Sequence, residues 1–154
     1  MFKPVRMLLL IPALTWVTAC SVMKPVRTVT HTKGHLSLNV ELDPDLNQDA
    51  PLAVDVITVS GKKTVADVST LTAQAYFQKR ASLKSMHPSD LQVYSWEWVP
   101  GQQVAPVIIP GSEVYDEIFL FANYSTPGSH AAALPKSGSV TASFGPEDFK
   151  VEKR

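Results

Sequence analysis

The stretch LSLNVEL, residues 36–42, decides the fold that this sequence predicts. Its apolar and polar side chains alternate strictly, which is the period of a β-strand with one face buried and one face in solvent. A connection rich in Asp, Asn and Pro follows over residues 43–51, and these residue types favour turns. The chain then resumes as LAVDVITV, residues 52–59, a β-branched segment typical of a strand. The domain is therefore expected to begin with two strands joined by a polar loop.

Five later segments also predict strands. The aromatic-rich segment 91–99 and the segment 104–109 are both short, and Pro106 in the second of them suits a strand at the edge of a sheet. The segment EIFLFANY, residues 117–124, is apolar on both faces and is expected to be a central strand that is covered on both sides. The last two strands are expected at residues 140–144 and 149–151.

One stretch between the second and third expected strands has a helical period. Its apolar residues recur mostly three or four positions apart, and Asp67 or Ser69 is expected to cap its main segment. Pro88 is expected to end it, because proline disfavours helix at the preceding residue. The periodic positions are Val65, Val68, Leu71, Ala75, Tyr76 and Leu83.

Seven short strands with one helical insertion after the second strand predict a mainly β domain. Turn signals at regular spacing favour a β-sandwich of transthyretin-like or immunoglobulin-like type. The helical part is expected to cover one side or one end of this sandwich.

The N-terminal residues predict a secretion signal that ends at a site of lipid attachment. Lys3 and Arg6 give a positive start, and the apolar run over residues 7–17 is too short to span a bilayer. The following Val17-Thr18-Ala19-Cys20 resembles the lipobox of bacterial lipoproteins, in which the cysteine is acylated. Cys20 is the only cysteine of the chain, so it has no partner for an intramolecular disulfide.

This interpretation divides the chain into three parts. Residues 1–19 are the expected signal peptide, residues 20–34 the lipidated cysteine with a flexible tether, and residues 35–154 the β-sandwich domain. The residue after the cysteine is Ser21 and not Asp, which would direct retention at the inner membrane. By resemblance to enterobacterial sorting rules, Ser21 therefore favours the outer membrane, with the domain facing the periplasm. The alternatives are an ordinary secretory signal with a stray cysteine nearby, or a buried apolar segment.

Composition limits the partners of the mature chain. Removal of residues 1–19 takes away Lys3 and Arg6 and leaves 12 basic residues against 14 acidic ones. Because there is no basic block, nucleic acid is not an expected partner.

The sequence offers no clear metal site, and no cofactor is expected. Asp43-x-Asp45-x-Asn47-x-Asp49 resembles the start of a calcium loop, but Gln48 and Val54 stand where an EF-hand needs Gly and Glu. The four histidines are expected to be solvated loop residues rather than metal ligands. They are His31, His35, His87 and His130.

Evidence for catalysis is equally weak, so no enzyme is expected. Glu97 with Asp116 or Glu117 would be a carboxylate pair, but any domain of this size offers such pairs. A small periplasmic hydrolase would need a cleft that brings His130 together with a Glu or Asp.

The paired tryptophans leave a second alternative open. Trp96 and Trp98 are two residues apart, so on a strand they face the same side. We expect them to fill the core, because large aromatic side chains dominate the interiors of such domains. If they were instead exposed with Tyr94, they would form an aromatic patch for a ligand-binding or inhibitor lipoprotein.

Several segments, in order, resemble the outer-membrane lipoproteins of the type VI secretion system, the TssJ (SciN) family. The shared features are the lipobox, the strand and Asp/Asn/Pro-rich turn at 36–51, the valine-rich strand at 52–59, the helical part with its aromatic residues, and WEWVPGQ at 96–102. The likeness extends over roughly residues 36–133. The chain departs from the family in lacking Gly-Arg before the proline of the turn, and in ending its second strand on Ile57-Thr58-Val59 rather than Tyr-x-Leu.

The resemblance implies a non-enzymatic role. Family members are anchored in the outer membrane and bind the periplasmic part of an inner-membrane protein, TssM, within an envelope-spanning complex. The loop between the first two strands contacts the partner there. Carried over, the partner-binding residues are Asp43, Pro44, Asp45, Leu46, Asn47, Gln48 and Asp49.

The residues of this loop agree with that role only in part. Two prolines stiffen it, its carboxylates favour a basic partner, and Leu46 is expected to be exposed as an anchor. The alternative is a solvated acidic turn with no partner.

Overall fold

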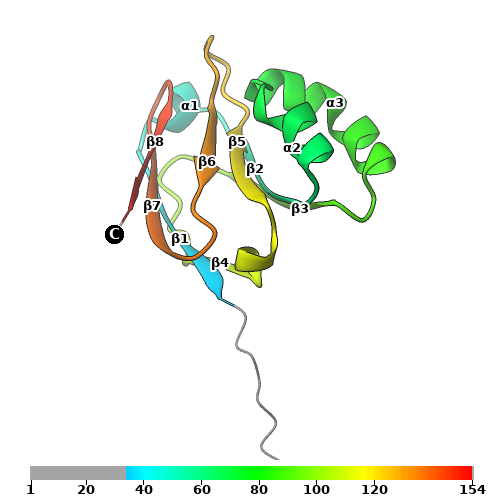
Figure 1. Ribbon diagram of the computed structural model, residues 1–154. Helices are drawn as coiled ribbons and strands as arrows, with labels where there is room; N and C mark the ends of the chain where they lie inside the picture. Colours follow the sequence, from blue (N-terminus) through cyan, green and yellow to red (C-terminus); the bar gives the residue numbers. More distant parts are fainter. Residues whose placement is uncertain (1–33, 154) are drawn as a thin grey trace, which may run out of the picture. The chain divides into compact units, whose positions relative to one another are not determined.

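The structure is a computed structural model that describes residues 34–153, and the expected signal peptide, Cys20 and nearly all of the expected tether lie outside them. Eight strands form two four-stranded sheets, with order β4-β1-β7-β8 in one and β3-β2-β5-β6 in the other (Figure 1). The strands are β1 (His35–Leu42), β2 (Leu52–Val59), β3 (Leu91–Trp98), β4 (Val107–Pro110), β5 (Glu117–Ala122), β6 (Ala131–Leu134), β7 (Gly138–Phe144) and β8 (Phe149–Lys153). The helical elements are α1 (Leu46–Asp49), α2 (Lys62–Ser69), α3 (Ala73–Met86) and the 3₁₀ turn η1 (Ser112–Val114).

The strand order decides between the two expected sandwich types. In immunoglobulin domains the first two strands lie in one sheet, whereas here β1 and β2 lie in different sheets. β1 pairs in parallel with β7, from Leu36 opposite Gly138 to Leu42 opposite Phe144, and all other pairings are antiparallel. The fold is therefore the transthyretin-like alternative. The expected mainly β class is confirmed.

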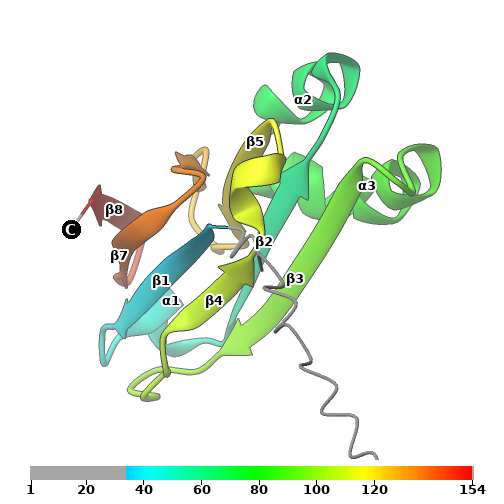
Figure 2. The same ribbon diagram turned by 60° about the horizontal axis from the view of Figure 1, so that its bottom comes forward.

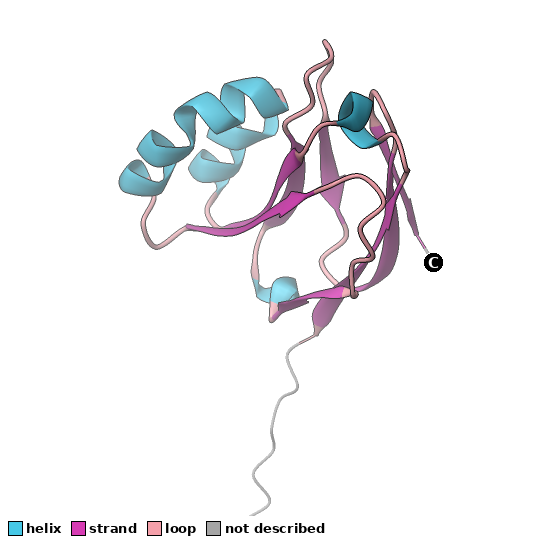
Figure 3. Ribbon diagram, turned by 180° about the vertical axis from the view of Figure 1, so that it is seen from behind, coloured by secondary structure: helices cyan, strands magenta, loops and turns pink. Residues whose placement is uncertain are grey.

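Two apolar clusters hold the described residues together. The larger one fills the space between the sheets, where the inward side chains of β1 and β7 meet those of β2 and β5. The smaller one lies between the outer face of the β3-β2-β5-β6 sheet and the helices α2 and α3, which cover that sheet (Figures 1 and 3). β5 is consequently buried on both faces, as its sequence predicts.

The helical insertion differs from its expected form. The sequence predicts one helix, but α2 ends at Ser69 and α3 begins at Ala73. Thr72 caps α3, since its Oγ1 accepts a hydrogen bond from the Ala75 main-chain N–H at 3.3 Å. Asp67 and Ser69 were therefore the wrong caps. Both helices pack on the same sheet, so apolar residues recur at helical spacing on both sides of the break. The apolar pattern of the sequence therefore does not show where α2 ends and α3 begins.

Two histidines that were expected to be solvated are buried. His87 is 9% exposed; its Nδ1 lies 3.2 Å from the Thr64 hydroxyl and its Nε2 lies 3.2 Å from an Asp67 carboxylate oxygen. These contacts join the end of α3 to α2. His130 is 7% exposed and lies at the opposite end of the sandwich, where the candidate site is.

Candidate functional site

Three connections meet at the end of the sandwich where β1 finishes and β2 starts. They are residues 43–51 between β1 and β2, residues 123–130 between β5 and β6, and residues 145–148 between β7 and β8 (Figure 1). We call these three connections the loop end. Gly34 precedes β1, so the loop end lies at the other end of β1 from Gly34 (Figure 2).

The β1–β2 connection contains a left-handed turn. Asn47, Gln48 and Asp49 have φ of 47°, 57° and 63°, a region that costs L-residues roughly 1–2 kcal/mol each and that Asn and Asp tolerate best. Main-chain bonds fix the turn from both sides: the Asn47 N–H donates to the Gly145 carbonyl at 3.2 Å, and the Ala50 N–H donates to the Asn47 carbonyl at 3.3 Å. The turn is thus shaped by its contacts with the rest of the fold.

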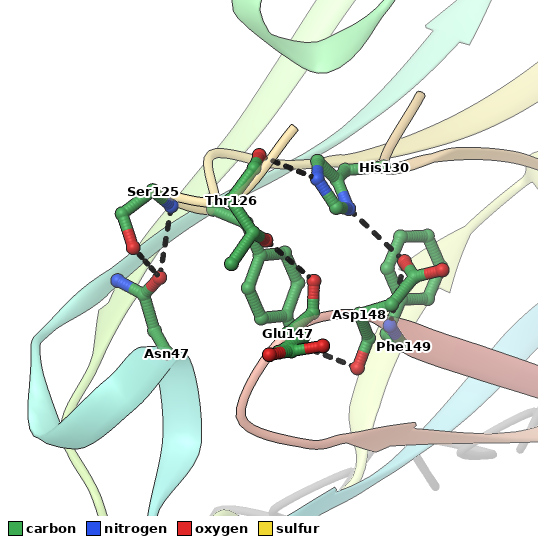
Figure 4. A network of polar contacts seen from close by, with 8 residues as sticks. Asn47, Ser125, Thr126, His130, Glu147, Asp148 and Phe149 are labelled. Carbon is green, nitrogen blue, oxygen red and sulfur yellow. Dashed lines mark hydrogen bonds and ion pairs between the residues drawn. The ribbon is translucent and has the colours of Figure 1, made fainter. Parts of the chain in front are cut away.

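The Asn47 side chain joins this turn to the β5–β6 connection. Its Oδ1 accepts hydrogen bonds from the Ser125 main-chain N–H at 3.0 Å and from the Ser125 hydroxyl at 3.2 Å (Figure 4). Its Nδ2 donates to the Pro51 carbonyl at 2.9 Å. Asn47 is only 4% exposed, so its side chain supports the loop end from within.

Asn47→Ala is expected to lower the free energy of unfolding by about 2 kcal/mol. The substitution removes the three hydrogen bonds that the buried Asn47 side chain makes to Ser125 and Pro51, and it places alanine at a positive φ. Urea denaturation followed by circular dichroism measures the change. Asn123→Ala, in an exposed position of the neighbouring connection, is the matched control; equal losses for both variants would contradict the role assigned to Asn47.

Leu46 is not the exposed anchor that the sequence predicts. Its side chain is fully buried and belongs to the core between the sheets. The left-handed turn folds back over the end of the sandwich, and this directs the one large apolar side chain of the loop inward. Of the seven predicted contact residues, the five that remain exposed are Asp43, Pro44, Asp45, Gln48 and Asp49.

A second set of hydrogen bonds joins the β5–β6 connection to the β7–β8 turn. The Thr126 hydroxyl donates to the Glu147 carbonyl at 2.7 Å, and His130 Nδ1 lies 3.1 Å from Asp148 Oδ1 (Figure 4). The Tyr124 hydroxyl donates to the Asp148 carbonyl at 3.0 Å. Burial, and to a smaller extent the nearby carboxylates, raise the pKa of Tyr124 above its usual value, so its hydroxyl remains a donor. These bonds make the three connections one surface.

The structure brings His130 together with Asp148, as the hydrolase alternative requires, but both nitrogens of its ring are occupied. Its Nε2 lies 2.9 Å from the Thr126 carbonyl oxygen while its Nδ1 faces Asp148, so neither ring nitrogen is free to take a proton from a nucleophile. A hollow of about 370 Å³ lies beside it, lined chiefly by residues 123–128 and 130. The Ser125 hydroxyl in that hollow donates to Asn47, so it is not paired with the histidine.

The other candidate sites in the sequence are not assembled. Glu97 lies opposite Ala53 and Glu117 opposite Val59, at the two ends of β2, which is about 20 Å at 3.3 Å per residue. Among residues 34–153 no group of three His, Asp, Glu or Cys side chains could hold a metal ion.

The tryptophans fill the core, as expected. Trp98 is 2% exposed and its ring packs against Phe144 with centroids 5.1 Å apart. Trp96 is half-buried and stacks on Trp98 at 6.1 Å. The aromatic patch needed for the ligand-binding alternative therefore loses one of its two tryptophans.

The loop end carries negative charge. Its exposed carboxylates come from two of the three connections, and Lys150 at the start of β8 is the one exposed cation beside them in the described part of the chain. A shallow hollow of about 380 Å³ lies between Asp43, Ser143 and the β7–β8 turn. The arrangement can bind a basic surface, because complementary charge speeds and orients association. The carboxylates are Asp43, Asp45, Asp49, Glu147 and Asp148.

Comparison with known proteins identifies the fold. No protein-family model and no curated protein sequence matches the chain. The solved structure of the T6SS lipoprotein TssJ1 from Pseudomonas aeruginosa matches 79% of this chain and 97% of its own, with a TM-score of 0.61 and 15% identity. Serratia marcescens Lip, a membrane-bound component of the type VI secretion system, matches 79% of this chain and 99% of its own, with a TM-score of 0.59 and 16% identity. A chain in the structure of the T6SS protein TssM C-terminal domain from EAEC matches with a TM-score of 0.60 and 12% identity, covering 79% of this chain and 99% of that one.

These likenesses place the domain in a structural class: it has the β-sandwich fold of type VI secretion lipoproteins. The resemblance to the TssJ family is confirmed at the level of the fold. No helix among residues 34–153 has the length and apolar character needed to cross a membrane.

Proposed function

We propose that this chain is a TssJ-type outer-membrane lipoprotein that anchors the envelope-spanning complex of a type VI secretion system. Acylated Cys20 holds it in the membrane, and the loop end, facing the periplasm, binds the periplasmic part of an inner-membrane protein of TssM type. The observation that carries the proposal is the match of 79% of this chain to nearly the whole length of two type VI secretion lipoproteins. The lipobox at residues 17–20 is an independent feature that points to the same class.

The geometry of the loop end supports a binding role rather than catalysis. Its backbone is fixed by the Asn47 and His130 hydrogen bonds, so little conformational entropy is lost when a partner docks. Asp43 and Asp45 are exposed and are free of ion pairs among the described residues. They are therefore available to meet a basic surface.

Reversing two of these charges is expected to weaken partner binding about tenfold or more. The variant is Asp43→Lys with Asp45→Lys, whose main-chain positions lie outside the left-handed region. Glu113→Lys with Glu152→Lys is the control, because it changes net charge equally on exposed residues away from the loop end. Full-length tagged chains are used to capture partners from detergent-solubilised envelopes.

Loss of a large inner-membrane protein with the loop-end variant alone supports the proposal. Retention by both variants, or loss by both, contradicts the loop assignment. If the unsubstituted chain captures no such protein, the anchoring role itself fails.

Cys20→Ser is expected to abolish lipid attachment and cleavage. Serine offers no thiol to acylate, so the precursor should keep residues 1–19 and run larger on a gel. Labelled palmitate should be incorporated into the unsubstituted chain and not into the variant, and the variant should leave the outer-membrane fraction. Incorporation of label by Cys20→Ser would overturn the lipobox assignment.

A further inference from the structure

Three of the four sheet edges carry features that block pairing with another chain. β4 and β6 are only four residues long, with Pro110 ending the first and Pro135 following the second. β8 carries exposed Lys150 and Lys153. Short strands, proline and lysine are the usual protections of sheet edges. β3 has none of them: it is eight residues long, LQVYSWEW, with Glu97 as its one charge.

The outer edge of β3 presents main-chain groups in a regular row. The Ser60 N–H donates to the Asp90 carbonyl at 2.7 Å, so even-numbered residues of β3 are hydrogen-bonded to β2. In an antiparallel pair such positions alternate with positions that face away. The N–H and C=O groups of Val93, Ser95 and Glu97 therefore point outward, and no other strand of residues 34–153 pairs with them.

This edge is complementary to itself. If two copies pair about a twofold axis at Ser95, each outward position meets an outward position: Ser95 meets Ser95, and Val93 meets Glu97 of the second copy. The half-buried Tyr94 and Trp96 then lie opposite each other as cross-strand aromatic pairs, which stabilise sheets. No like charges face each other in this register.

Charge also favours this register. Glu97 of the second copy would lie opposite Val93 on the outer face of the sheet, which α3 covers. Arg80 of α3 lies over the same stretch, since its guanidinium donates to Asp55, the residue paired with Ser95. Its side chain is 42% exposed, so it can also interact with an incoming carboxylate.

We propose that the β3 edge binds the β3 edge of a second copy of this chain, antiparallel and centred on Ser95, giving one continuous eight-stranded sheet. The pairing uses β3 and not the exposed carboxylates of the loop end. The two interactions can therefore be tested separately, and failure of one leaves the other standing.

Disulfide trapping in the full-length chain tests the register. Opposite residues at hydrogen-bonded positions have Cα atoms about 5.5 Å apart, within the range for a disulfide. Ser95→Cys should therefore give a covalent dimer when membranes are oxidised, and Val93→Cys should be trapped by Glu97→Cys on a differently tagged copy. Val93→Cys alone should not form a covalent dimer, because Val93 of the second copy lies four residues away, about 13 Å along the strand. Ser143→Cys on β7 and the unsubstituted chain, with Cys20 as its sole cysteine, are the controls.

A dimer of Ser95→Cys no more abundant than that of Ser143→Cys would overturn the proposal. So would trapping of Ser95→Cys to a different protein in place of a second copy. Sedimentation of the detergent-solubilised chain gives a readout without cysteine: association should rise with concentration and disappear in Ser95→Lys, with its circular dichroism spectrum unchanged. An unsubstituted chain that stays monomeric from low to high micromolar concentration would also overturn it.

Discussion

Arg80→Ala is expected to lower the free energy of unfolding by about 3 kcal/mol, because it leaves the carboxylate of Asp55 buried without its cation. Asp55 lies in the middle of β2 and its side chain is 1% exposed. Arg80 on α3 donates to both of its oxygens, at 3.1 and 3.3 Å, and the Tyr76 hydroxyl donates at 2.8 Å. The expected loss is at the lower end for a broken buried pair, since Arg80 is 42% exposed and water can partly replace it.

The pKa of Tyr76 depends in part on the same Asp55 carboxylate. Burial raises the pKa of Tyr76 well above its usual value, and the Asp55 charge raises it further against the opposing effect of Arg80. Tyr76 therefore remains a donor throughout the physiological range, and its ring stacks on Phe121 with centroids 4.3 Å apart. The network attaches α3 to the central strands of the sheet that it covers.

Urea denaturation of four chains tests this account: unsubstituted, Arg80→Ala, Asp55→Ala and the double variant. The double variant should cost clearly less than the sum of the single ones, because it removes the unpaired charge together with its partner. Lys84→Ala, exposed on the same helix, should change stability by less than about 0.5 kcal/mol. If Arg80→Ala costs no more than Lys84→Ala, the pair behaves as an ordinary surface ion pair and the account is wrong.

The strands were predictable from sequence where side-chain periodicity reflects burial directly. β1 alternates and one of its faces is buried, and β2 is β-branched and nearly fully buried. β6 was missed because its sequence is Ala-Ala-Ala-Leu, and alanine has little preference for strands. Its conformation comes from pairing with the apolar β5, a contact distant in sequence.

The candidate site was only partly predictable, for a related reason. A single Leu46 among polar residues shows that something apolar must cover it, but the sequence does not say whether this is a partner or the core. The hydrogen bonds from Ser125 to Asn47, 78 residues away, hold the turn in the conformation that directs Leu46 into the core. No local sequence pattern predicts these bonds. Asp55 did leave a signal: one charge in an apolar strand requires a buried partner.

Trp98→Ala is expected to cost about 3–5 kcal/mol of stability, the range for removing a large aromatic side chain from a packed core. Its indole lies between the sheets, 2% exposed, in contact with Phe144 of the opposite sheet and with Trp96. Truncation would open a cavity that the two sheets cannot close without losing their register. Trp96→Ala, on the same face of the same strand but half-buried, should cost roughly half as much, because less apolar area returns to water.

The pair of variants also distinguishes a core from a ligand-binding patch, because a patch side chain can be removed with little effect on folding. Urea denaturation followed by circular dichroism gives the stability of each variant, and Trp98→Phe, which keeps most of the apolar volume, should recover much of the loss. Tryptophan emission of the processed chain should be blue-shifted and mostly insensitive to an added quencher. Equal, small losses for Trp96→Ala and Trp98→Ala, with emission that is readily quenched, would contradict the core assignment. That result would favour the ligand-binding alternative, with the aromatic face of β3 as the ligand site.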